Sequence, residues 1–163
     1  MPANNANRSP ADPRHPDHAE FCEAYGKAML EANNMFGAGF DIMRVHGGVP
    51  GADMYKSTFG SLKHSLTELL NKQRSGSSVV PGFEDFLREF STAIPLRNDI
   101  AHGIPTKKGL FRYDEVNGSE LLYDTVESLD NLRRKFRRVA MLGDNVAKHD
   151  YTQYATWVKR GCS

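Results

Sequence analysis

The stretch 83-FEDFLREFSTAIPLRNDIAHG-103 decides the fold of this chain, because it joins a strongly amphipathic segment to a group of polar residues. Its apolar side chains recur at three- and four-residue steps and predict a helix that begins near Pro81. The inward-facing residues of this helix are Phe83, Phe86, Leu87, Phe90 and Ile94. Pro95 removes a backbone donor and its ring clashes with the preceding turn, so we expect it to break or kink the helix. Residues 96–102 then form a short, redirected helical turn that ends at Gly103.

Two further apolar stripes lie on the N-terminal side of this stretch. The first predicts a long helix from about Asp17 to residues 47–51, whose glycines and proline cannot continue a helix. The second predicts a helix from about Asp53, with Tyr55 in its stripe, that ends in the serine- and glycine-rich residues 75–78.

On the C-terminal side, the pattern predicts a hairpin and then a long helix. Residues 110–114 and 120–124 are strand-like and flank a turn at residues 116–118. Asp124 and Glu127 predict a capping box for the last long helix. A tail helix follows, with the aromatic residues Tyr151, Tyr154 and Trp157. The predicted fold is therefore an all-α antiparallel bundle of four to five helices, with a short β-hairpin before the last long helix.

Composition and charge exclude several classes of protein. With 163 residues, 39% of them hydrophobic, the chain is long enough for one domain with its own core. A net charge of +1 argues against a globally basic nucleic-acid binder, so affinity for phosphate has to come from a local patch. Cys22 and Cys162 lack the spacing of a zinc site or a disulfide framework, so we expect no metal and no cofactor.

The N-terminal segment has a different composition from the rest of the chain. Residues 1–17 carry four prolines and few large apolar side chains, so we expect a disordered tail, with a single helical domain over residues 18–163. The tail lacks the layout of a signal peptide, and no apolar run approaches the length of a membrane span. We therefore expect a cytoplasmic protein with no membrane association.

The polar residues after Pro95 carry the chemistry. Arg97 is a cation that can hold a phosphate, and His102 is an imidazole that can move a proton. Cleavage of RNA by its own 2′-hydroxyl requires these two functions and no metal, because the nucleophile is already in the substrate. Asn98 would orient His102 or cap a backbone group. Asp99 lies three residues before His102 and favours its charged form if the two side chains share a face.

The spacing of the two proposed catalytic residues sets a geometric condition. On a regular helix Arg97 and His102 lie about 140° apart, whereas Asn98 and His102 lie within about 40°. Either a bend at the helix end or a second copy of the chain is then needed to bring the arginine and the histidine together. We favour a homodimer whose twofold axis runs near the motif.

An arginine followed by four to six residues and a histidine is weak evidence by itself, because Arg8 and His15 in the N-terminal tail also satisfy that spacing. The asparagine directly after Arg97, the interleaved apolar residues and the position between the third and last long helices distinguish the motif. In these features the chain resembles the HEPN superfamily, small α-helical bundles with an Arg-polar-x-x-x-His type motif near the end of the third helix. The resemblance covers residues 19–148.

The resemblance implies a metal-independent endoribonuclease that acts as a toxin, an antiphage factor or an RNA-processing effector. It implies a homodimer with motifs from both subunits facing one cleft, RNA as the substrate, and a cognate antitoxin or inhibitor protein as a further partner. It also leaves an alternative open, because some members have lost activity and serve as RNA- or protein-binding modules. In that alternative Arg97 pairs with a carboxylate and His102 closes a helix end.

A basic cluster in the last long helix is a second candidate site. It consists of Arg133, Arg134, Lys135, Arg137 and Arg138. These side chains could follow an RNA backbone. The alternative is a solvated helix face, because acidic residues precede the cations in the order that a helix dipole favours. His46, His64 and His149 form no spaced metal set and are expected at the surface.

Overall fold

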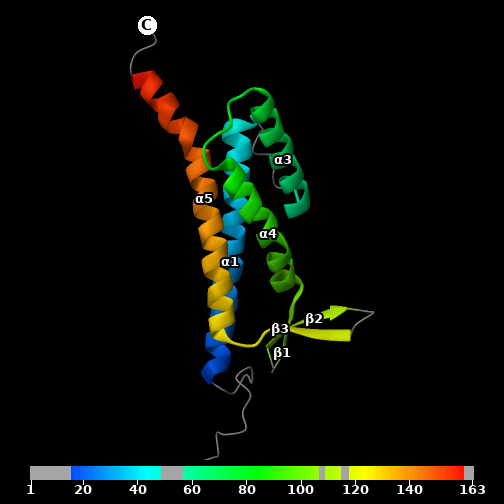
Figure 1. The fold of residues 1–163 in the computed structure, drawn as a ribbon. Helices are drawn as coiled ribbons and strands as arrows, with labels where there is room; N and C mark the ends of the chain where they lie inside the picture. Colours follow the sequence, from blue (N-terminus) through cyan, green and yellow to red (C-terminus); the bar gives the residue numbers. More distant parts are fainter. Residues whose placement is uncertain (1–15, 49–56, 107–108, 115–117, 160–163) are drawn as a thin grey trace, which may run out of the picture.

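A computed structural model describes residues 16–48, 57–106, 109–114 and 118–159 (Figure 1). The elements follow in the order α1 (Pro16–His46), α3 (Phe59–Ser75), α4 (Phe83–His102), β1 (Ile104–Thr106), β2 (Gly109–Asp114), β3 (Gly118–Tyr123) and α5 (Val126–Lys159). A mostly helical bundle with a hairpin before the last helix is thus confirmed. The predicted tail lies outside the described residues except for positions 16 and 17, which begin α1.

Two long helices, α1 and α5, form the spine of the bundle and run in the same direction (Figure 1). Their close approach depends on small residues. A Cβ atom on Gly143 of α5 would lie 2.8 Å from the Cβ of Ala38 on α1 and 2.8 Å from the ring of Phe86 on α4. Further along, His46 Nε2 lies 2.8 Å from the carbonyl oxygen of Val146. His46 is therefore a half-buried contact between α1 and α5, and the expectation of an ordinary surface position was wrong.

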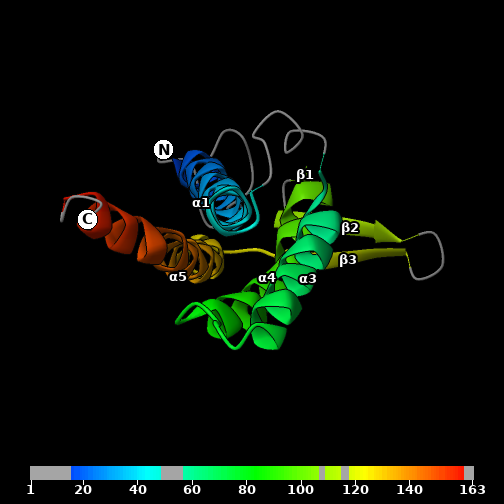
Figure 2. The same ribbon diagram turned by 90° about the horizontal axis from the view of Figure 1, so that it is seen from above.

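The other two helices complete the bundle. α4 runs antiparallel to its neighbours α3 and α5, and α3 packs on α1 and α4 on the side away from α5 (Figures 1 and 2). Aromatic and aliphatic side chains of all four helices meet in one core, whose largest fully buried members are Met35, Ile42, Leu66, Phe83, Phe86, Phe90, Ile100, Leu110, Leu129, Phe136, Val139 and Val146.

The helix α4 continues through Pro95 to His102, so the predicted break and redirected turn are wrong. Only the donor to the Ser91 carbonyl is lost at Pro95, and the proline ring itself lies at the exposed surface. Buried residues on one face anchor both halves, with Phe90 and Ala93 before the proline and Ile100 after it. This packing compensates for the missing hydrogen bond. The end of the helix before Gly103 is as predicted.

The start of α3 also differs from the sequence-based prediction. Thr58 caps the helix, its side chain accepting from the Ser61 backbone N–H at 3.2 Å while Ser61 Oγ accepts from the Thr58 N–H at 2.8 Å. The described helix therefore begins at Phe59 and not at Asp53. Residues 49–56, which include Tyr55 and the predicted start, lie outside the described residues.

The predicted hairpin is present, and it belongs to a three-stranded antiparallel sheet in the order β1-β2-β3. The predicted strands pair through Phe111 with Leu121 and Arg112 with Glu120. The additional strand β1 pairs Ile104 with Phe111, and its proline is accommodated because β1 is an edge strand. Of the predicted turn, only Gly118 is described, with a φ of 77° at the start of β3.

The last helix begins one residue away from the predicted capping box. Ser128 N–H donates to Thr125 Oγ1 at 3.1 Å, so Thr125 takes the capping role predicted for Asp124, while Ser128 Oγ donates to the Thr125 carbonyl oxygen at 2.8 Å. The predicted tail helix is not separate, because α5 continues unbroken to Lys159. Among the described residues, no helix is long and apolar enough to cross a membrane.

The junction between α4 and the sheet is tightly packed. A Cβ atom on Gly103 would lie 2.5 Å from Leu110 Cγ, which is fully buried. We expect Gly103→Ala to lower the free energy of unfolding by about 1–3 kcal/mol, since overpacking forces side chains and backbone to shift. Urea denaturation measures the change.

Gly26→Ala is the matched control for this substitution. Gly26 lies inside α1 with nothing within 4 Å of an added Cβ, so alanine should raise the free energy of unfolding by about 0.5–1 kcal/mol. Equal stability of Gly103→Ala and the wild type would contradict the packing argument.

Candidate functional site

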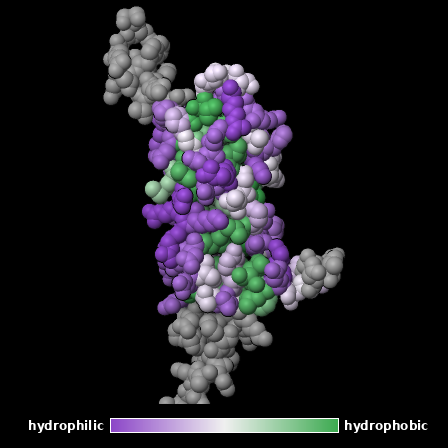
Figure 3. All heavy atoms as spheres, viewed as in Figure 1, coloured by the Kyte–Doolittle hydropathy of each residue, from purple (hydrophilic) through white to green (hydrophobic). Residues whose placement is uncertain are grey.

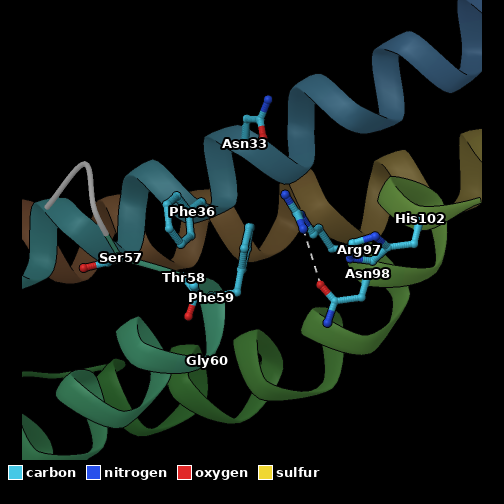
Figure 4. Close-up of a pocket in the computed structure, with 9 residues that line it drawn as sticks. All are labelled: Asn33, Phe36, Ser57, Thr58, Phe59, Gly60, Arg97, Asn98 and His102. Atoms are coloured by element: carbon cyan, nitrogen blue, oxygen red, sulfur yellow. Dashed lines mark hydrogen bonds between the residues drawn. The ribbon is translucent and has the colours of Figure 1, made fainter.

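Three residues of the motif, Arg97, Asn98 and His102 of α4, line one cleft (Figure 4). This cleft has a volume of about 540 Å³ and lies between α1, the start of α3 and the last turns of α4. The remaining lining residues are Asn33 and Phe36 from α1, and Ser57, Thr58, Phe59 and Gly60 from the start of α3. The α4 wall of this cleft was predicted from the sequence, whereas the walls from α1 and from the start of α3 were not.

Arg97 is held in the cleft by an aromatic ring. Its Cζ atom lies 4.6 Å from the centroid of the Phe59 ring, a cation–π contact. Its Nη1 donates a long hydrogen bond of 3.4 Å to Asn98 Oδ1 (Figure 4). Its Nε is buried and has no hydrogen-bond partner among the described residues. Within those residues no carboxylate pairs with Arg97, in contrast to the alternative in which the motif arginine is a structural ion-pair partner.

His102 is the last residue of α4, and its side chain is exposed. It lines the same cleft as Arg97 in a single chain, although α4 is continuous between them. Neither a bend nor a second copy is therefore needed to bring both residues to one cleft. The described contacts contain no hydrogen bond between Asn98 and His102, and the Asn98 amide oxygen accepts from Arg97 instead.

Asp99 does not line the cleft. Its Oδ1 accepts from Arg112 Nη1 of β2 at 2.8 Å, and Arg112 Nη2 also donates to Glu120 of β3 at 2.6 Å. The hydrogen bond that Arg112 donates to Glu120, and then the charges of Glu120 and Asp99, raise the pKa of Arg112. Asp99 thus ties the end of α4 to the sheet, and the expected interaction with His102 is replaced by one with Arg112.

Tyr25 also holds the last turns of α4, and Tyr123 feels the charge of Asp99 there. The Tyr25 hydroxyl of α1 donates to the carbonyl oxygen of Ile100 at 3.0 Å, and the Ile100 side chain is fully buried. Tyr123 of β3 is half-buried, and burial, followed by the charge of Asp99, raises its pKa. The helix end that carries His102 is therefore fixed to α1 on one side and to the sheet on the other.

The basic cluster of α5 lies apart from the cleft, and none of its five residues lines it. Arg133 pairs with Asp130 at 3.4 Å, and Arg134 donates to Asn131 at 3.1 Å. The flank of the molecule along which α5 runs in Figure 1 is largely hydrophilic in Figure 3. These contacts within the helix fit a solvated face.

Metal-binding clusters are absent from the described part of the chain, where no three His, Cys, Asp or Glu side chains come together. His64 instead lies 3.3 Å from Glu68 on the exposed side of α3. The only sequence signal for the missed walls of the cleft is the Thr-x-x-Ser cap at Thr58 and Ser61, which marks the helix start that faces Arg97.

No protein-family model matches this chain, and none of the curated proteins or solved structures compared with it shows significant similarity. The resemblance to the HEPN superfamily stays a prediction that depends on the motif and its surroundings.

The raised pKa of Tyr123 predicts a specific loss of stability in alkali. Above about pH 10 the phenol ionises first in the unfolded chain, which then binds fewer protons than the folded one. The free energy of unfolding therefore falls as pH rises toward the pKa of the folded state. Tyr123→Phe should flatten this decline, measured by urea denaturation between pH 8 and 11, values that bracket about 10, the reference pKa of tyrosine.

Tyr113→Phe is the matched control, because Tyr113 lies on the same sheet and is 66% exposed. This variant should keep the alkaline slope of the wild type. The same slope in Tyr123→Phe and Tyr113→Phe would show that Tyr123 contributes nothing to it.

Proposed function

We propose that this protein is a metal-independent endoribonuclease of the HEPN type, with Arg97 and His102 as its catalytic residues. The observation that carries the proposal is the state of Arg97, a cation stacked on Phe59 in a cleft with His102, with no carboxylate partner among the described residues. An unneutralised guanidinium can bind the phosphate of a phosphodiester. An exposed imidazole in the same cleft can serve as the acid or base that cleavage of the phosphodiester needs.

The reaction uses the 2′-hydroxyl of the substrate as the nucleophile. Its oxygen attacks the adjacent phosphorus as the proton leaves, and the bond from phosphorus to the 5′-oxygen breaks. The 5′-oxygen takes up a proton, so the products are a 2′,3′-cyclic phosphate and a 5′-hydroxyl. His102 removes the first proton or supplies the second, and Arg97 stabilises the charge on the non-bridging oxygens of the transition state. DNA is resistant because it lacks the nucleophile.

The proposal includes a homodimer, in which a second His102 is available for the other proton transfer. This part depends on the resemblance. On the same basis we propose a cytoplasmic toxin, antiphage factor or RNA-processing effector with a cognate antitoxin or inhibitor protein. The basic cluster of Arg133, Arg134, Lys135, Arg137 and Arg138 is a secondary RNA contact at most, because it lies outside the cleft.

A binding module without catalysis is the second candidate function. It is favoured by the exposed ring of His102, which no hydrogen bond to a described residue orients. A general base usually needs such an orienting contact. In this version Arg97 still binds the RNA phosphate, and no bond is broken.

The test is cleavage of end-labelled RNA in EDTA. We expect the wild type to form 2′,3′-cyclic phosphate ends, and Arg97→Ala and His102→Ala to lose at least about 100-fold in rate, as removal of a charge stabiliser or a proton-transfer group does. Fluorescence anisotropy with the same RNA separates the two candidates. Binding that Arg97→Ala weakens, without cleavage by the wild type, identifies the binding module.

Matched controls exclude general effects of removing an arginine or a histidine. Arg88 lies on α4 and pairs with Asp85 at 2.7 Å, and His64 pairs with Glu68 on α3; both are exposed and outside the cleft. Arg88→Ala and His64→Ala should cleave like the wild type. The ribonuclease assignment is wrong if Arg97→Ala and His102→Ala both cleave like the wild type, or if Arg88→Ala and His64→Ala lose as much activity as they do.

A further inference from the structure

Phe59 belongs to the core and to the cleft at the same time. It is 7% exposed and contributes to the core of the bundle. It is the first residue of α3, and its ring faces the Arg97 guanidinium at 4.6 Å (Figure 4). The same side chain therefore packs in the core and contacts Arg97, the one arginine or lysine among the described residues that line the cleft.

The Phe59 ring is itself fixed from two sides. The Phe36 ring of α1 lies 4.2 Å from it, and the Phe90 ring of α4 is stacked on it at 6.0 Å. Its backbone is fixed by the Thr58 cap, whose reciprocal bonds with Ser61 close the helix start. A ring held by three elements offers Arg97 a rigid platform, which a flexible aliphatic side chain would not.

The charge of Arg97 stays available because the described residues on the opposite wall of the cleft are neutral. The first turn of α3 has no acidic residue, and a serine hydroxyl fills the capping position that a glutamate often takes. By contrast, Arg74 and Arg112, near the two ends of α4, are both paired with carboxylates. The cation–π contact orients Arg97 without neutralising it, so its charge remains for an anion.

We propose that Phe59 is the positioning residue for Arg97, holding the guanidinium at the place where the scissile phosphate of RNA binds. This inference depends on the proposed function for its substrate. An arginine that is already oriented needs no reordering when the phosphate arrives, so most of the benefit appears in the transition state.

The experiment compares Phe59→Leu with Phe83→Leu, since both remove one ring from the same core. Phe83 is fully buried, but the rings that pack on Phe59 are those of Phe36 and Phe90. We expect Phe59→Leu to lose about 10- to 100-fold in kcat with little change in KM, the size of effect that small misplacements of a catalytic group cause. Phe83→Leu should stay within about threefold of the wild type, and Phe59→Tyr should restore the rate, since a tyrosine ring also accepts a cation.

A second measurement needs no activity, and its first result needs no variant. In the wild type the Phe59 ring current should shift the side-chain Hδ and Hε resonances of Arg97 upfield in the NMR spectrum. Phe83→Leu should keep this shift and Phe59→Leu should lose it. Arg97 resonances at their unshifted positions in the wild type overturn the inference, as does an equal loss of kcat in Phe59→Leu and Phe83→Leu.

The two proposals fail in different ways. Absence of RNA cleavage by the wild type, with the upfield shift present, overturns the ribonuclease and leaves the positioning of Arg97 by Phe59 standing. Normal cleavage with no upfield shift overturns the positioning role alone.

Discussion

The burial of one face of α4 is the constraint on which the rest of the structure depends. Phe83, Phe86 and Phe90 anchor the first part of the helix, and Ile100 anchors the end that carries the motif. This continuous packing allows the helix to pass through Pro95, where local rules predict a break. Arg97 and His102 both follow Pro95 on α4, so a helix broken at that point would move both of them away from the cleft walls that α1 and α3 supply.

Charge is distributed in opposite ways on the two sides of α4. On the sheet side Arg112 is neutralised by Asp99 and Glu120, and this pairing keeps the motif carboxylate out of the cleft. On the cleft side Arg97 meets an aromatic ring and an amide, with no described carboxylate. The same short stretch of sequence thus supplies a structural ion pair to one neighbour and an unneutralised cation to the other.

Helical periodicity predicted the fold class, because the stripes on all four described helices correspond to buried faces. Local signals failed where tertiary packing outweighed them, as at Pro95, or where two adjacent residues were equally good caps, as at Asp124 and Thr125. For the site, the α4 residues were predictable from their types and spacing. Phe59 and Asn33 were not, since they reach the cleft only through packing between distant segments, and the partner of Asp99 depended on a strand register that no local pattern encodes.

The junction at Gly103 has a mechanical consequence. One residue separates His102, the end of α4, from Ile104, the start of β1, and there is no room for a side chain between that residue and Leu110. The connection is short and tightly packed, so the orientation of the sheet and that of the helix end are coupled. A displacement of the sheet would reach the residue that carries the imidazole through the two peptide bonds on either side of Gly103, and the Tyr25 hydrogen bond to Ile100 on α4 would resist it.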